Sequence, residues 1–133
     1  MVLRKNCQIV KKIKLFLFIW LAPIVWASLI FLASSFPLPT ERIPPFPFFD
    51  KIIHFFAYIP LGFLVAQALF FSNSFKKNFI ILTLVFCLLY GLSDEFHQLF
   101  VENRQASILD ALADFLGSGV GLTVFNFFIA KKE

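Results

Sequence analysis

The chain has 133 residues, of which 59% are hydrophobic, and its mean hydropathy is +0.84. Soluble domains contain about 45–50% apolar residues, so this composition excludes an ordinary water-soluble enzyme or binding module and favours one membrane domain over the whole chain. The formal net charge is +4, but no recognised nucleic-acid motif accompanies the basic residues, so we expect them to signal membrane topology and expect no nucleic-acid partner.

Four apolar stretches are predicted to be membrane-spanning helices, since about 20 helical residues cross a bilayer core of roughly 30 Å. They cover about residues 15–35, 52–71, 79–99 and 108–130. The predicted fold is therefore all-α, a four-helix transmembrane bundle. The basic N-terminus followed by an apolar run also resembles a signal peptide. The run is longer than the usual 7–15 apolar residues of such a peptide, so a retained helix is favoured.

The charged residues are divided between the two sides of the predicted membrane. Nine of the twelve Lys and Arg lie before the first span, between the second and third spans, or after the fourth. By the positive-inside rule these segments and both termini are cytoplasmic, and the chain is a multi-pass protein of the cytoplasmic (inner) cell membrane. Seven of the eight carboxylates lie in the other two segments or in the helix ends that meet them: Glu41, Asp50, Asp94, Glu95, Glu102, Asp110 and Asp114.

The first predicted span has no ionisable residue, and we interpret it as an anchor and a wall. The segment that follows is rich in proline, which opposes helix and favours extended structure. Such a stiff segment could cap the polar residues from outside or serve only as a connector. Its prolines are Pro37, Pro39, Pro44, Pro45 and Pro47.

Polar residues open the second span. Asp50, His54 and Tyr58 are spaced i, i+4, i+8, so they share one helix face, and Lys51 lies beside them. A carboxylate in the first turn also suits the positive end of the helix dipole. This face is predicted to contribute to a polar layer near the outer side of the membrane.

A second polar group closes the third span. Asp94, His97 and Gln98 share a face by their i, i+3, i+4 spacing, and Glu95 follows Asp94 directly. At 1.5 Å per residue, Asp94 should lie less than about 10 Å below the outer edge of the apolar core. His54, one turn into its own helix, is predicted to lie at a similar depth.

The fourth span carries two carboxylates near its start, followed by two glycines. Asp110, Asp114, Gly117 and Gly121 follow one stripe of the helix, and Arg104 precedes it in the short connecting segment. The small-xxx-small pattern of the two glycines lets another helix approach closely. We therefore expect this helix to turn its carboxylates inward and to pack tightly beneath them.

Together these residues form one predicted layer with two interpretations. Ionisable groups inside a membrane are costly, so the layer is either a functional site or a network of ion pairs that holds the bundle together. Asp and His side chains also suit a divalent metal such as zinc or manganese, although the spacing matches no zinc motif and defines no ligand set.

The order and spacing of these residues over 50–121 resemble the VanZ-like family. The motifs are Asp50-Lys51-x-x-His54-x-x-x-Tyr58, Ser93-Asp94-Glu95-x-His97-Gln98-x-Phe100 and Arg104-x-x-Ser107-x-x-Asp110-x-x-x-Asp114-x-x-Gly117-x-x-x-Gly121. One departure is Asp114, where this family usually carries Asn. The resemblance implies a small bacterial integral membrane protein, in a family whose founding member is associated with teicoplanin resistance. It supplies an architecture and a polar site, and no reaction.

The leading interpretation is a cell-envelope protein that binds a lipid-linked or amphipathic molecule at the outer leaflet. Whether it also modifies that molecule stays open. The candidates for acid/base or metal chemistry are His54, Asp94, Glu95 and His97. The candidates for binding are Asp50, Lys51, Tyr58, Gln98, Arg104, Asp110 and Asp114, of which Lys51 and Arg104 would contact anionic groups.

Two other classes of function compete with this interpretation. The first is a non-catalytic binding or partner protein whose polar layer is structural. The second is a small ion-coupled transporter, which would need a polar path to the cytoplasm. The inner halves of the spans offer only Gln67, Thr83, Thr123 and Asn126, so transport ranks third.

Overall fold

The computed structural model describes residues 2–37, 48–72 and 75–131, without the side chains of residues 2–14. Within these ranges the chain is helical: α1 (Val2–Ser34), α2 (Phe49–Phe71), the short 3-10 helix η1 (Lys76–Asn78), α3 (Phe79–Gln98) and α4 (Ile108–Ala130). The four α-helices are long and apolar enough to cross a membrane. This confirms the predicted all-α fold with four candidate membrane-spanning helices.

The helix boundaries differ most from the predicted ones at their beginnings. α1 begins at Val2, well before the predicted span, and α2 begins at Phe49, so that Asp50 lies in its first turn. Both helices continue through an internal proline, Pro23 in α1 and Pro60 in α2. Most of the proline-rich segment, residues 38–47, lies outside the described residues, so its predicted role as cap or connector is not tested.

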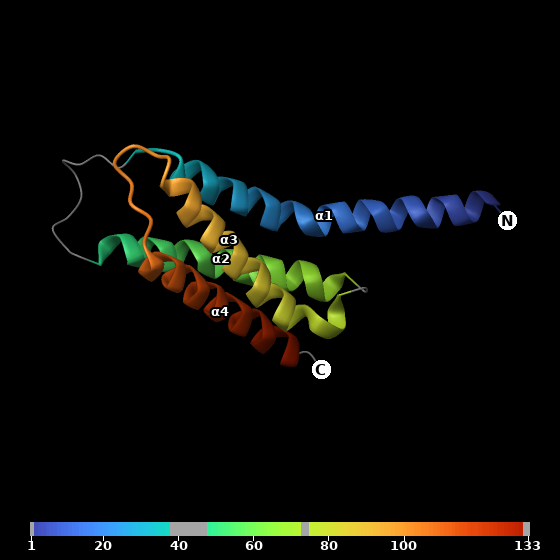
Figure 1. Cartoon of the computed structure of the whole chain (residues 1–133). Helices are drawn as coiled ribbons and strands as arrows, with labels where there is room; N and C mark the ends of the chain where they lie inside the picture. Colours follow the sequence, from blue (N-terminus) through green and yellow to red (C-terminus); the bar gives the residue numbers. More distant parts are fainter. Residues whose placement is uncertain (1, 38–47, 73–74, 132–133) are drawn as a thin grey trace.

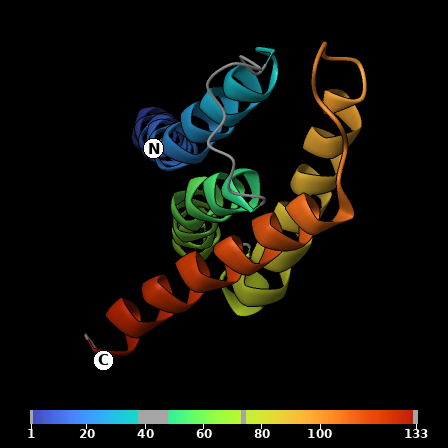
Figure 2. The ribbon, with the colours of Figure 1, turned by 90° about the vertical axis from the view of Figure 1, so that its left-hand side faces the viewer.

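α2 is the central helix of the bundle. It makes its most extensive contact with α4 and also contacts α1 and α3, whereas α1 lies against α2 and, less closely, α3 (Figure 2). Only 11% of the candidate span of α1 is buried within the protein, against 44% for α2 and for α4. Most of the surface of α1 therefore faces outward, where an apolar helix meets lipid.

The close contact between α2 and α4 depends on glycines. A Cβ atom on Gly121 would overlap the carbonyl oxygen of Ile59, and one on Gly117 would overlap that of Phe55. Gly62 of α2 in turn lies against the backbone of Ser118. Without side chains at these positions, the two helix backbones approach closely and gain van der Waals contact. The predicted packing role of Gly117 and Gly121 is thus confirmed.

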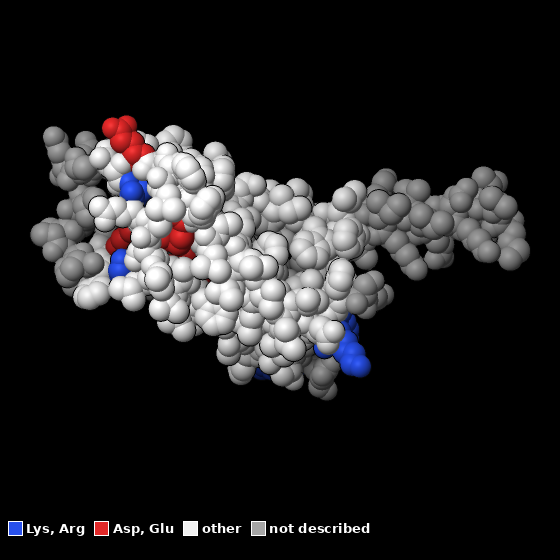
Figure 3. Space-filling view, in the orientation of Figure 1, with Lys and Arg blue, Asp and Glu red and all other residues white. Residues whose placement is uncertain are grey.

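The polar and apolar parts of the bundle are separated along its length. α1 and α3 end at the same end of the molecule at which α2 and α4 begin, and the described carboxylates gather at this end (Figures 1 and 3). We call it the polar end. The opposite end holds η1, with Lys76 and Lys77, and the end of α4, which Lys131 follows (Figure 1). Between the two ends runs an apolar core that includes Leu61, Val65, Leu69, Leu122 and Phe125.

Candidate functional site

Four ionisable side chains from three helices meet in the polar end. His54 of α2, Asp94 and Glu95 of α3, and Asp114 of α4 are all buried, and each offers one ligand atom within 4.8 Å of those of the others. We call these four residues the polar cluster. They meet because they lie within about two turns of helix ends that are level with one another. The prediction that His54 and Asp94 lie at a similar depth is confirmed.

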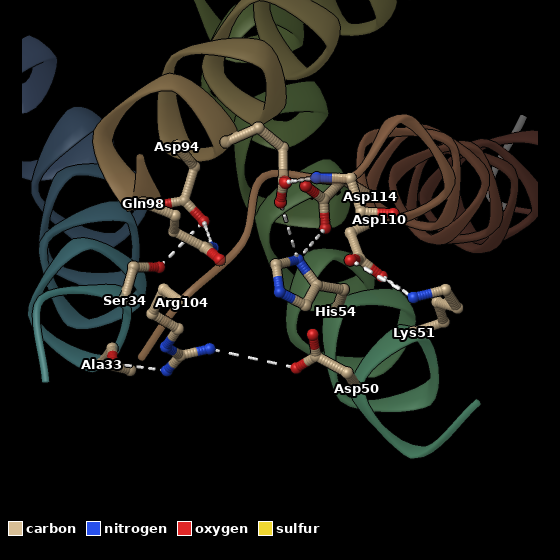
Figure 4. A network of polar contacts seen from close by, with 12 residues as sticks. Ala33, Ser34, Asp50, Lys51, His54, Asp94, Gln98, Arg104, Asp110 and Asp114 are labelled. Atoms are coloured by element: carbon tan, nitrogen blue, oxygen red, sulfur yellow. Dashed lines mark hydrogen bonds and ion pairs between the residues drawn. The ribbon is translucent and has the colours of Figure 1, made fainter. Parts of the chain in front are cut away.

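One nitrogen of His54 faces two carboxylates of the cluster, and Figure 4 shows its contact with Asp114. Its Nδ1 atom is 3.0 Å from Oδ1 of Asp114 and 3.8 Å from Oε1 of Glu95. One imidazole nitrogen is thus shared between a short hydrogen bond and a longer electrostatic contact. This arrangement fixes the ring orientation and presents Nδ1 to the acidic side of the cluster.

Neighbouring groups orient the two carboxylates of α3. Asp94 Oδ2 accepts hydrogen bonds from Ser34 Oγ at 2.8 Å and from Gln98 Nε2 at 3.3 Å. Glu95 Oε2 accepts one from the backbone N–H of Ser107 at 2.7 Å, which links the end of α3 to the start of α4. Sequence analysis missed Ser34, since α1 was expected to act only as an anchor and a wall. The one feature of the sequence that could have pointed to Ser34 is its hydroxyl group near the outer end of an apolar helix.

Several oxygen atoms of this region are buried without a hydrogen-bond partner among the described residues. They are Oδ1 of Asp94, Oε1 of Glu95, Oδ2 of Asp114 and the hydroxyl of Tyr58. Leaving a buried polar group unpaired costs about 1–3 kcal/mol, and more for a charged group. The cluster therefore has unused capacity to accept a proton, a donor group or a cation.

Two ion pairs surround the cluster at the polar end. Lys51 Nζ lies 3.0 Å from Oδ1 of Asp110 and 3.3 Å from its Oδ2. Arg104 lies 3.9 Å from Asp50 and donates a hydrogen bond of 3.2 Å to the carbonyl oxygen of Ala33, near the end of α1. Lys51 is thus closely paired with Asp110, whereas the contact between Arg104 and the Asp50 carboxylate is long.

His97 does not join the polar cluster. Its Nε2 atom lies 3.0 Å from the hydroxyl oxygen of Ser35, and its ring packs on that of Phe31 with centroids 4.5 Å apart. Three residues along a helix correspond to a rotation of about 60° away from the starting position, which turns His97 from Asp94 toward α1. The shared face inferred from i, i+3 spacing was too broad to distinguish these two directions.

A chamber of about 260 Å³ lies between α1 and α2 beside the cluster. Two residues of its apolar wall, Leu29 and Ile53, are 52% and 47% exposed, so the chamber borders the lipid-facing surface. The rest of the apolar wall is Trp26, Ile30, Ala33 and Ala57. The polar lining is Ser34, Asp50, His54, Tyr58, Asp94 and Arg104. The predicted shared face of Asp50, His54 and Tyr58 is thus the α2 side of this chamber.

The Asp50–Arg104 pair stands between this chamber and a second hollow. The two residues also line a polar hollow of about 800 Å³, which Lys51 and Asp110 border as well. The chamber therefore has an apolar side toward the membrane and a polar side toward the end of the bundle, with a long ion pair at their junction.

A sequence model of the VanZ/LLP1 family matches residues 11–129, nearly the whole chain. No curated protein and no solved structure matches. The matched range covers α2 and α3 completely, most of α1 and α4, and every residue of the polar cluster.

Proposed function

The chain belongs to the VanZ/LLP1 family of membrane proteins, and from that premise we propose that it binds the headgroup of an amphipathic cell-envelope molecule in the chamber between α1 and α2. The observation that supports this function is the lining of the chamber, which joins an apolar wall to a buried polar cluster. Ligand sites of this kind hold an apolar body against apolar side chains and orient the ligand with a few polar groups.

Each part of the chamber suits one part of such a molecule. Leu29 and Ile53 border lipid, so an acyl or prenyl chain can remain in the bilayer while its headgroup enters. Arg104 is the cationic group best placed for an anionic headgroup, since its 3.9 Å contact with Asp50 is long and Lys51 is occupied by Asp110. A guanidinium binds phosphate or carboxylate through two parallel hydrogen bonds, which fixes orientation as well as charge.

Transport has less support than binding. Below the polar cluster the bundle is filled by the apolar core, and the hydroxyl of Thr83 donates to the carbonyl of Phe79 in its own helix. Thr123 likewise donates to Gly119. In the described part of the chain these threonines therefore offer no relay from the cluster toward the opposite end.

The proposed site lies at the outer leaflet of the cytoplasmic membrane, because the basic segments mark the opposite end as cytoplasmic. We expect an impermeant maleimide to label Glu102→Cys in intact cells and to spare Lys76→Cys, both in a Cys7→Ser, Cys87→Ala background. Glu102 is preferred to Asn103, whose φ of 60° disfavours other side chains. Labelling of Lys76→Cys alone would place the site at the inner leaflet.

Filling the chamber should block the ligand. We expect Ala57→Leu to raise the Kd for dihexanoyl phosphatidylglycerol, an anionic short-chain probe, about tenfold, which corresponds to about 1.4 kcal/mol. Isothermal titration of the purified full chain in detergent measures this. The matched control is Ala22→Leu, on an exposed part of α1 away from the chamber, which should bind like wild type. Equal affinities for all three proteins would contradict the proposed function.

A further inference from the structure

We propose that the polar cluster is a divalent-cation site whose ligands are His54, Asp94, Glu95 and Asp114. The inference deepens the proposed function, and only its last step, the bridging of the cation to a headgroup, rests on that function. Three observations carry it: the geometry of the four donors, the oxygen on each carboxylate that lacks a hydrogen-bond partner among the described residues, and the excess of carboxylates over nearby cationic groups.

The four donor groups already lie close to the separations that a bound cation requires. Their ligand atoms are all within 4.8 Å of one another. Bonds of about 2.0–2.2 Å place neighbouring donors about 2.8–3.1 Å apart at an octahedral angle and about 3.3–3.6 Å apart at a tetrahedral angle. The 3.0 Å contact between His54 and Asp114 fits the first range, and small side-chain movements would draw in the more distant donors.

Each carboxylate is held by one oxygen atom and leaves the other free. Asp94 is held through Oδ2 by Ser34 and Gln98, and its Oδ1 has no partner among the described residues. Glu95 is held through Oε2, and its buried Oε1 has no hydrogen-bond partner among the described residues, with His54 Nδ1 at 3.8 Å. Metal sites are built in this way, because outer hydrogen bonds orient the ligands while the remaining lone pairs point at the ion.

Asp114 follows the same rule. Its Oδ1 contacts His54, whereas its Oδ2 is buried and has no partner among the described residues. The three carboxylates that meet in this small volume thus each keep one oxygen atom without a hydrogen-bond partner among the described residues. A network built only for structure would be expected to satisfy its own members, because half-satisfied polar groups cost stability.

The charge of the cluster also calls for a cation. It contains three carboxylates and one imidazole, and the nearby cationic side chains face other carboxylates: Lys51 faces Asp110, and Arg104 faces Asp50. Buried charges are normally paired or coordinate a metal. A donor set of one imidazole and three carboxylates favours a transition metal such as Mn²⁺ or Zn²⁺ over Ca²⁺ or Mg²⁺, which bind mainly oxygen.

A cation at this point would also change what the chamber can bind. His54 and Asp94 line the chamber, so a cation held between them would border it. A hard divalent ion such as Mn²⁺ takes up to six ligands, so positions remain beyond the four side chains for a headgroup oxygen. The cation would thus convert an acidic wall into a receptor for an anionic group such as phosphate.

The direct test is metal content. The full chain is purified in detergent, stripped with EDTA, incubated with Mn²⁺ or Zn²⁺ alone, desalted and analysed for metal. Wild type and His97→Gln should retain about one ion per chain, because His97 lies outside the cluster. His54→Gln and Glu95→Gln should raise the Kd at least about 100-fold, because loss of outer partners alone typically costs 10–100-fold in affinity. Equal metal content in wild type and His54→Gln would overturn the inference.

A second measurement needs no ligand variant. Mn²⁺ or Zn²⁺ should raise the melting temperature of wild type and of His97→Gln, and EDTA should reverse the rise, because an ion that binds only the folded chain stabilises it. The absence of a shift would overturn the inference. Titration of dihexanoyl phosphatidylglycerol in EDTA then separates the two proposals. Lipid binding without ion binding refutes only the cation, and ion binding without lipid binding refutes the headgroup function.

Discussion

Gly121→Leu is expected to lower the free energy of unfolding in detergent by at least about 3 kcal/mol, the upper part of the usual range for overpacking a core. The reason is that a Cβ atom at Gly121 would overlap the backbone carbonyl of Ile59 and crowd the backbone nitrogen of Phe63. Backbone atoms in the middle of a helix cannot move aside as a flexible side chain can, so α2 and α4 must separate. Thermal or denaturant unfolding followed by circular dichroism measures the loss.

The control for this experiment lies two residues away on the same helix. A Cβ atom on Gly119 meets nothing within 4 Å, so Gly119→Leu adds the same side chain on a face without close neighbours. We expect its melting temperature to match that of wild type within the error of the measurement. Similar losses for both variants would show that the helix as a whole resists leucine and that the α2–α4 contact is not the cause.

Asp94→Asn is expected to keep the melting temperature of wild type or raise it while weakening headgroup and cation binding about 100-fold. An asparagine keeps the volume and can still accept hydrogen bonds from Ser34 and Gln98. It also removes one buried carboxylate from a cluster whose charge exceeds that of its partners. Melting and binding of the same purified sample give the two values.

Asp110→Asn provides the contrast, because Asp110 forms an ion pair with Lys51, whereas the described partners of Asp94 are the neutral side chains of Ser34 and Gln98. The change removes one charge from the contact with Lys51, whose side chain is 24% exposed. Hydrogen bonds to charged groups contribute about 1.5–3 kcal/mol, and partial exposure of Lys51 should place the loss near the lower value. If Asp94→Asn lost as much stability as Asp110→Asn, the polar cluster would be a structural network, and we would withdraw its role as a site.

The features that were predicted well from the sequence depend only on properties of single helices. Hydropathy gave the four spans, and the spacing of Gly117 and Gly121 gave the face on which α4 meets α2, because glycines at i, i+4 lie on one face of any helix. The common depth of His54 and Asp94 followed from the rise per residue. None of these inferences requires the position of a second helix.

The features that sequence did not predict require the rotation of one helix against another. His97 faces Ser35 of α1 although it lies one turn from Asp94, and Ser34 reaches Asp94 from a helix that carries no charge in its span. Glu95 accepts a hydrogen bond from the Ser107 backbone, and Lys51 pairs with Asp110. Spacing alone cannot choose among such partners, since several residues on neighbouring helices lie within reach of each side chain.

The shallow packing of α1 sets the route by which the proposed ligand would reach the chamber. Leu29 of α1 and Ile53 of α2 are exposed apolar residues of its wall, and little of α1 is buried. A molecule anchored in the bilayer would therefore arrive by lateral diffusion within one leaflet, in two dimensions, and not from water. Its occupancy would then follow its mole fraction among the surrounding lipids. In detergent, the same ligand is diluted by every added micelle, so the apparent affinity should fall as detergent rises at constant ligand concentration.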